Sequence, residues 1–86
     1  MNRLINCLLS LNKNGKSLPK HIRQELNNPN ELLKLRISEL RIDSLELYEL
    51  IMLIEDHMNV RLAEEKVLSS KTMADISDAL DAAFKP

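Results

Sequence analysis

The sequence predicts an all-α fold, a small four-helix bundle with a long first connection. The first observation is composition: 44% of the residues are apolar but only 2% are aromatic, so the core must be built from Leu, Ile and Met. Such a core, with one Gly and three Pro in the chain, suits helices better than twisted strands. The second observation is that apolar residues recur at three- and four-residue spacings in several segments. At 86 residues there is room for one core, so a single domain is expected over residues 1–86, with its core within about 2–84.

In the first half of the chain, apolar spacing predicts a helix over residues 2–12 and a short helix over 19–26. Asn14-Gly15 separates them, because this dipeptide favours a turn. Ser17-Leu18-Pro19 is a typical helix start with proline in the first turn. Residues 31–42 match neither the helical nor the strand period. They predict an ordered loop packed against the core, in which one helical turn would fit.

The clearest predicted helix runs from Ser44 to about Met58, because Asp43 or Ser44 can cap its free amides. Two apolar faces follow from its spacing. The core stripe comprises Leu47, Leu50, Ile51, Ile54 and Met58. The second face, called the apolar strip below, comprises Leu45, Tyr48 and Met52, with acids around it at Glu46, Glu49, Glu55 and Asp56.

The last part of the chain predicts a break over residues 59–63, a short helix over 64–69 and a final helix over 72–84. Thr72 and Asp75 stand at the spacing of a capping box, with Asp in place of the usual Glu. The apolar face of the final helix comprises Met73, Ile76, Ala79, Leu80 and Ala83.

Charge is distributed unevenly along the chain. Residues 1–42 hold eight Lys or Arg against three acids, whereas residues 43–86 hold ten acids against four Lys or Arg. Nucleic acid would be repelled by the second half, and the first half lacks aromatic residues among its bases for stacking, so no nucleic-acid partner is expected. The acidic half favours a protein partner with basic patches.

The cellular compartment is predicted from apolar runs and cysteine use. No apolar run approaches the roughly 18 residues of a membrane span. The apolar start of the chain is interrupted by Asn6 and is not followed by a small-residue cleavage site, so a secretion signal is not expected. Cys7 is the single cysteine, which excludes an internal disulfide and fits a reducing compartment. We expect a cytoplasmic monomer with Cys7 as a small core residue.

Common catalytic and metal-binding patterns are missing from the sequence. His21 and His57 have no partner at metal-ligand spacing, so no metal site is expected. Gly15-Lys16-Ser17 resembles the end of a phosphate-binding loop, but Ser10 occupies the position of the required first glycine. No catalytic residue is therefore predicted, and the chain is not expected to be an enzyme.

The remaining candidate is the segment 40–45, which leads directly into the helix over 44–58. Taken alone, Asp43-Ser44-Leu45 is a common tripeptide, and the simplest interpretation is a helix cap. The apolar strip beside Ser44 changes this interpretation, because a monomer has no structural reason to expose it. The combination favours an exposed serine beside a surface for partners.

Across residues 35–82 the sequence resembles the acyl carrier protein family. The family pattern L-G-x-D-S-L, then E-L and an acidic pair, corresponds here to Leu40-Arg41-Ile42-Asp43-Ser44-Leu45, Glu49-Leu50 and Glu55-Asp56. Its short third helix and the entry to its last helix are similar to residues 60–65 and 71–76.

The resemblance implies a bundle of acyl-carrier-protein type in which a separate phosphopantetheinyl transferase attaches 4′-phosphopantetheine from coenzyme A to Ser44. A role for Asp43 in orienting that encounter and a role as cap alone are both open. The implied partners are acyl-loading, ketosynthase or acyltransferase-type enzymes. The implied docking residues are Leu45, Glu46, Tyr48, Glu49, Met52, Glu55 and Asp56.

The sequence departs from the family pattern at three positions. Arg41 replaces the usual glycine, so the loop cannot rely on the positive φ freedom of glycine. Ala63 replaces a common proline, and Arg61 a common acid. With the basic first half, these changes favour a specialised carrier of fatty-acid, polyketide or secondary-metabolite assembly. An aminoacyl or peptidyl carrier and an unmodified helical adaptor are the alternatives, and Asp43 before the serine favours the acyl carrier.

Overall fold

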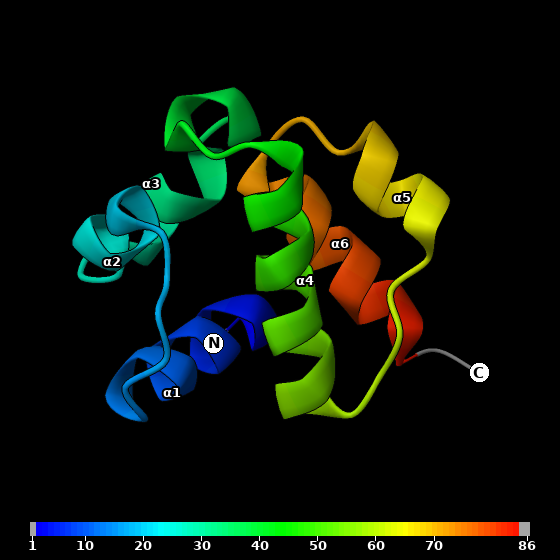
Figure 1. The fold of residues 1–86 in the computed structure, drawn as a ribbon, viewed down its shortest axis with the longest axis horizontal. Coiled ribbons are helices and arrows are strands. Elements are labelled where there is room, and N and C mark those ends of the chain that lie inside the picture. The colour runs from blue at the N-terminus through cyan, green and yellow to red at the C-terminus, as the bar shows by residue number, and fades with distance from the viewer. Residues whose placement is uncertain (1, 85–86) are drawn as a thin grey trace.

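The computed structural model describes residues 2–84, and its regular structure there is helical (Figure 1). Four helices, α1, α4, α5 and α6, form the bundle, while α2, α3 and the 3-10 turn η1 lie in the long connection between α1 and α4. This confirms the predicted all-α class. None of the helices in the described part of the chain is both long and apolar enough to cross a bilayer. The bounds are α1 Arg3–Lys13, α2 Lys20–Glu25, α3 Pro29–Lys34, η1 Ile37–Leu40, α4 Ser44–Met58, α5 Glu64–Ser69 and α6 Met73–Ala83.

Helix α1 is fixed against α6 by side chains at its start. Asn2 caps α1, since its Oδ1 accepts from the Ile5 N–H at 3.1 Å, while its Nδ2 donates to the Ser77 Oγ at 2.8 Å. Arg3 pairs with Asp81 at 3.1 Å, in an exposed position where an ion pair adds little stability. Helix α1 therefore contacts α6 through a hydrogen bond and an ion pair as well as through the apolar core.

The long connection contains one helix more than the sequence predicted. The helix expected over 19–26 is confirmed as α2. Residues 29–34 form α3, although residues 31–42 were expected to be an ordered loop in which one helical turn would fit. Pro29 is its first residue, where a fixed φ suits a helix and the missing N–H is not needed. Glu31 in its first turn and Lys34 in its last complement the helix dipole. Leu32 anchors it by complete burial.

Two backbone hydrogen bonds join the connection to the segment between α5 and α6. The Ile37 N–H donates to the Lys71 carbonyl at 2.9 Å, and the Met73 N–H donates to the Leu35 carbonyl at 2.9 Å. They form an isolated antiparallel bridge. The bridge holds the end of the long connection in place just before α4 begins.

The predicted capping box of the last helix is present. The Asp75 N–H donates to the Thr72 Oγ1 at 3.2 Å, and the Thr72 N–H donates to the Asp75 Oδ2 at 3.2 Å. The Lys71 N–H donates to the same Oδ2 at 2.8 Å. These donors, that of Lys71 most strongly, hold the pKa of Asp75 below its ordinary value, because they stabilise the carboxylate.

Helix α4 stands between the connection carrying α2 and α3 on one side and α5 on the other (Figure 1). Its predicted core stripe faces inward: Leu50, Ile51 and Ile54 are buried, and Leu47 and Met58 are partly buried against the same core. The core stripe of α4 therefore packs into the bundle, while side chains on its other faces remain exposed to solvent. The largest fully buried side chains of the other helices are Leu4, Ile5 and Leu8 of α1, Ile22 of α2, Leu32 of α3, and Met73, Ile76 and Leu80 of α6.

Candidate functional site

The start of α4 shows which of the two candidate residues caps the helix. The Asp43 Oδ1 accepts from the Glu46 N–H at 2.8 Å, and the Glu46 Oε1 accepts from the Asp43 N–H at 3.5 Å. Asp43 is therefore the cap and Ser44 is the first helical residue. Because the aspartate performs the capping, the serine hydroxyl is not needed to begin the helix.

Ser44 is exposed, and the backbone around it suits an attached phosphate group. Among the hydrogen bonds within residues 2–84, none takes the amides of Ser44 or Leu45 as donors. Free amides at the start of a helix carry partial positive charge and bind phosphate oxygens. A phosphodiester on the Ser44 hydroxyl would lie at this end of α4, so the residues present fit a phosphopantetheine arm.

Arg41 has an unexpected backbone conformation three residues before Ser44. The absence of glycine suggested a loop without a positive φ, yet Arg41 adopts φ 54° and ψ 40°. The chain must turn sharply here, because Leu40 is buried and α4 begins shortly afterwards. Left-handed backbone costs a residue with a Cβ roughly 1–2 kcal/mol. Asn59, which ends α4 in the same conformation, is a residue type that tolerates it better.

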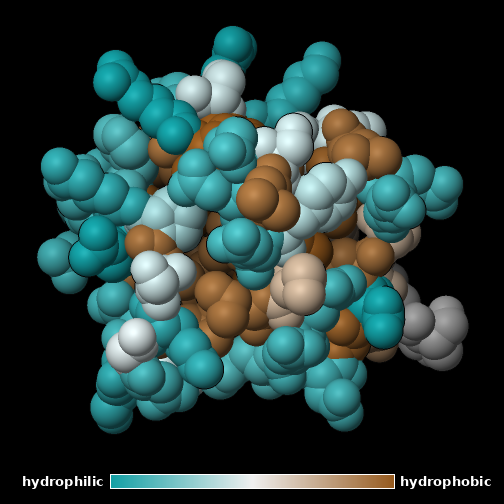
Figure 2. Space-filling view, in the orientation of Figure 1, coloured by the Kyte–Doolittle hydropathy of each residue, from teal (hydrophilic) through white to brown (hydrophobic). Residues whose placement is uncertain are grey.

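The apolar strip of α4 is exposed to solvent. Leu45 is 67% exposed, Met52 59% and Tyr48 37%, whereas Ile54 on the core stripe is 0% exposed. In Figure 2, apolar side chains emerge among polar ones over the face where α4 lies. The two faces predicted from spacing are therefore distinct in the folded protein.

The four acids predicted around the strip do not all have the same surroundings. Glu46, Glu49 and Asp56 are exposed. Glu55 is partly buried, and its Oε2 accepts from the Leu62 N–H at 2.8 Å. It fixes the segment between α4 and α5. The helical spacing did not predict this hydrogen bond, because its donor, Leu62, lies in an irregular segment seven residues after Glu55.

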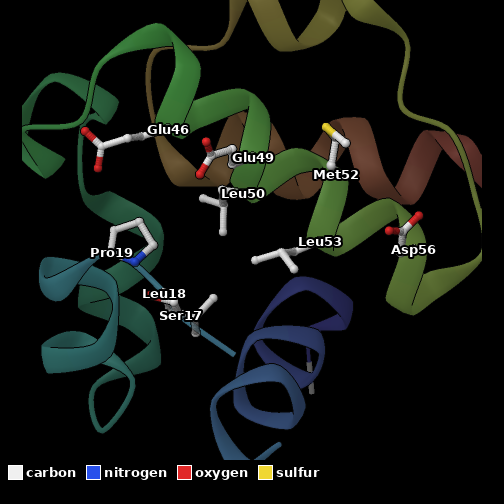
Figure 3. Close-up of a pocket in the computed structure, with 9 residues that line it drawn as sticks. All are labelled: Ser17, Leu18, Pro19, Glu46, Glu49, Leu50, Met52, Leu53 and Asp56. Carbon is white, nitrogen blue, oxygen red and sulfur yellow. The ribbon is translucent and has the colours of Figure 1, made fainter. Parts of the chain in front are cut away.

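A groove runs along another side of α4, and the sequence did not predict it (Figure 3). Leu50 and Leu53 point from α4 toward the connection between α1 and α2, which forms the opposite wall. The groove has a volume of about 460 Å³. Its lining comprises Ser17, Leu18 and Pro19 from the connection, and Glu46, Glu49, Leu50, Met52, Leu53 and Asp56 from α4.

Comparison with known proteins supports the interpretation of this region. The model of a family described as "Phosphopantetheine attachment site" matches residues 16–80. An acyl carrier protein homolog of Ureaplasma parvum serovar 3 is 40% identical over 53 residues, which cover 62% of this chain and 69% of that protein. No solved structure matches the chain significantly. The family match spans the connection, α4, α5 and most of α6, and its cofactor is covalently attached 4′-phosphopantetheine. The chain therefore belongs to the acyl carrier protein family, whose members are carriers and not catalysts.

Proposed function

We propose that Ser44 is the attachment point of the 4′-phosphopantetheine arm and that the chain carries acyl groups on that arm to partner enzymes. The observation that carries the proposal is the division of roles at the start of α4. Asp43 caps the helix, and Ser44 presents an exposed hydroxyl beside two free amides. The arm supplies a terminal thiol that holds the acyl group as a thioester.

The attachment step forms one bond and breaks one. The Ser44 oxygen displaces adenosine 3′,5′-bisphosphate from the pyrophosphate of coenzyme A, so a serine–phosphorus bond replaces the phosphoanhydride bond. The hydroxyl proton passes to a base, and the leaving group departs with the negative charge. In such in-line transfers a metal ion neutralises the phosphate charge, and here the base and the metal belong to the transferase.

The exposed faces of α4 would bring partner enzymes to the arm. Leu45, Tyr48 and Met52 supply apolar contact, and apolar anchors near the centre of an interface carry much of its energy. Glu46, Glu49 and Asp56 add negative charge, which speeds encounter with a basic surface more than it tightens binding. Glu55 contributes to the same potential while it holds the segment after α4. A carrier that visits several enzymes needs fast encounter and release.

The basic first half and the substitutions at Arg41, Arg61 and Ala63 support a specialised pathway, such as a dedicated fatty-acid, polyketide or secondary-metabolite assembly. Asp43 before the serine supports an acyl cargo rather than an aminoacyl one. The partners would be the transferase, an acyl-loading enzyme, and ketosynthase or acyltransferase-type enzymes. The proposed working form is a cytoplasmic monomer.

Intact mass measurement tests the attachment point directly. The protein is incubated with coenzyme A, magnesium and a promiscuous phosphopantetheinyl transferase. We expect one added phosphopantetheine on the wild type and on Ser69→Ala, an exposed serine on α5, and none on Ser44→Ala. Modification that persists in Ser44→Ala would contradict the assignment. A wild type that stays unmodified would favour the unmodified adaptor.

A further inference from the structure

Arg41 lies between η1 and α4 in a backbone conformation that its side chain makes costly. Its φ of 54° and ψ of 40° fall in the left-handed region, which glycine adopts without steric cost. Residues with a Cβ persist there only where the surrounding structure imposes it, and they cluster at functional and ligand-binding sites. Glycine would suit this turn better, so the turn itself does not explain the arginine.

The charge of Arg41 is isolated in the sequence and in the folded protein. No other Lys or Arg occurs between Arg36 and Arg61, a stretch that contains six acids. The Arg41 side chain is exposed. Within the described residues, the ion pairs join Arg3 to Asp81 and Lys34 to Glu31, and neither involves Arg41. Its positive charge is therefore not compensated by an ion pair in this part of the chain.

The carboxylates nearest to Arg41 in the sequence are bonded to backbone amides instead. The Glu39 Oε1 accepts from the Arg36 N–H at 3.0 Å. The Asp43 Oδ1 accepts from the Glu46 N–H at 2.8 Å, and the Glu46 Oε1 accepts from the Asp43 N–H at 3.5 Å. These bonds hold the acids in capping positions, which leaves the guanidinium group of Arg41 available to another anion.

An arm attached to Ser44 would bring such an anion close to Arg41. The phosphodiester is negatively charged, and its phosphorus would be bonded to the Ser44 oxygen. Ser44 follows Arg41 by three residues, so their Cα atoms are at most about 11 Å apart. The flexible stem of an arginine side chain covers much of this distance. Among the side chains of residues 39–46, Arg41 alone would attract the phosphodiester, because the other charged groups are the acids Glu39, Asp43 and Glu46.

We infer that the guanidinium group of Arg41 binds the phosphodiester at the base of the phosphopantetheine arm. The planar guanidinium group suits this role, because its parallel N–H groups match two phosphate oxygens. The unbonded amides of Ser44 and Leu45 can bind the same group from the end of α4. The contact holds the base of the arm against the turn before α4 and offsets repulsion from Asp43. The inference rests on the proposed attachment at Ser44.

The test measures how strongly residue 41 and the arm are coupled. Apo-protein and modified protein are prepared for the wild type and for Arg41→Gln, which removes the charge but keeps the Cβ and therefore the backbone cost. Urea unfolding gives the unfolding equilibrium constant of each form at the same urea concentration. Attachment of the arm should favour the folded state about two- to fivefold more in the wild type than in Arg41→Gln, as expected for an exposed ion pair. A purely structural role of Arg41 would affect apo-protein and modified protein equally.

Phosphorus NMR of the modified protein observes the contact directly. The phosphorus resonance of the wild type should differ from that of Arg41→Gln. This difference should shrink at about 1 M salt, where charges are screened over about 3 Å. Arg41→Lys keeps the charge without the planar group and should retain only part of the difference.

Arg61→Gln is the charge-matched control, because it removes an exposed arginine near the other end of α4. Arg61 precedes Leu62, whose N–H donates to Glu55, and Glu55 follows Ser44 by eleven residues, or about 16 Å along the helix. That distance exceeds the screening length of about 10 Å at 0.1 M salt. Arg61→Gln should therefore behave like the wild type in both measurements.

Equal effects of the arm in the wild type and in Arg41→Gln, or identical phosphorus resonances, would overturn the inference. An equally large change in Arg61→Gln would overturn it too, because net charge would then be the cause. If circular dichroism shows that Arg41→Gln is unfolded, Arg41→Lys and the wild-type resonance decide, and a resonance that does not respond to salt refutes the contact. A wild type that stays unmodified in the mass assay overturns both proposals, whereas modified protein without coupling overturns this one alone.

Discussion

Truncating two neighbouring side chains of α4, Ile54 and Met52, should separate stability from function. Ile54 is 0% exposed, so Ile54→Ala leaves a cavity in the core and should lower the free energy of unfolding by about 2–5 kcal/mol. Met52 is 59% exposed, so Met52→Ala should cost less than about 1 kcal/mol. A domain of this length has a total stability of roughly 4–13 kcal/mol, so Ile54→Ala removes a large part of it.

Urea unfolding followed by circular dichroism measures this difference. With a slope of about 1–3 kcal/mol per M urea, Ile54→Ala should lower the midpoint by roughly 1 M or more, and Met52→Ala by a few tenths. A transfer assay with the modified protein then completes the test. Met52→Ala should slow transfer of the acyl group to a partner enzyme while it stays folded. If Met52→Ala instead unfolds as readily as Ile54→Ala, the apolar strip is buried and the docking argument fails.

Four further predictions concern single residues. Arg41→Gly should raise the free energy of unfolding by up to about 1 kcal/mol, since glycine accepts the positive φ without steric cost. Arg41→Ala keeps the Cβ and should not raise it. Equal urea midpoints for the two variants would contradict this explanation. Glu55→Ala should cost about 1–3 kcal/mol, because the partly buried Leu62 N–H loses its acceptor, whereas Glu49→Ala should stay within about 0.5 kcal/mol in the same melts. Glu49→Lys should slow modification of Ser44 by the transferase, by a factor that shrinks as salt is raised; a factor independent of salt would exclude an electrostatic cause. The pKa of Asp75 is lower in the folded state than its ordinary value of 3.8. The carboxylate therefore stabilises the fold fully above pH 3.8, and this stabilisation is lost as the pH falls through the folded pKa. Asp75→Asn should flatten the acid side of the plot of unfolding free energy against pH, and an unchanged plot would contradict this.

Local signals predicted much of this fold. The length of α4, a cap at Asp43 or Ser44 and the capping box at Thr72 follow from side chains within a few residues of one another, and the structure selects Asp43 as the cap. The separation of the apolar strip from the core stripe also followed from helical spacing alone. These features depend on residues that are close in the sequence, so they can be predicted without knowing the tertiary contacts.

The missed features depend on contacts between distant segments or on weak local signals. Pro29 marks the start of α3, but the helix has only six residues, too few for a periodic pattern to emerge. The groove exists because Ser17–Pro19 packs beside α4, about thirty residues away in sequence. The bond from Glu55 to the Leu62 amide depends on the path of an irregular segment. The spacing of residues within α4 does not indicate that Ser17–Pro19 or the segment containing Leu62 packs beside this helix.

The burial of Cys7 has a consequence for the chemistry of a modified carrier. A carrier arm ends in a thiol, and a second reactive thiol on the same molecule could form a disulfide with the arm or accept its acyl group. Cys7 is 1% exposed, and burial raises the pKa of its thiol to about 11. Only about one molecule in 10⁴ would then hold the thiolate, the reactive form, at pH 7. Thiol reagents should therefore label the arm alone, so the cargo site can be alkylated or cross-linked in the unaltered protein.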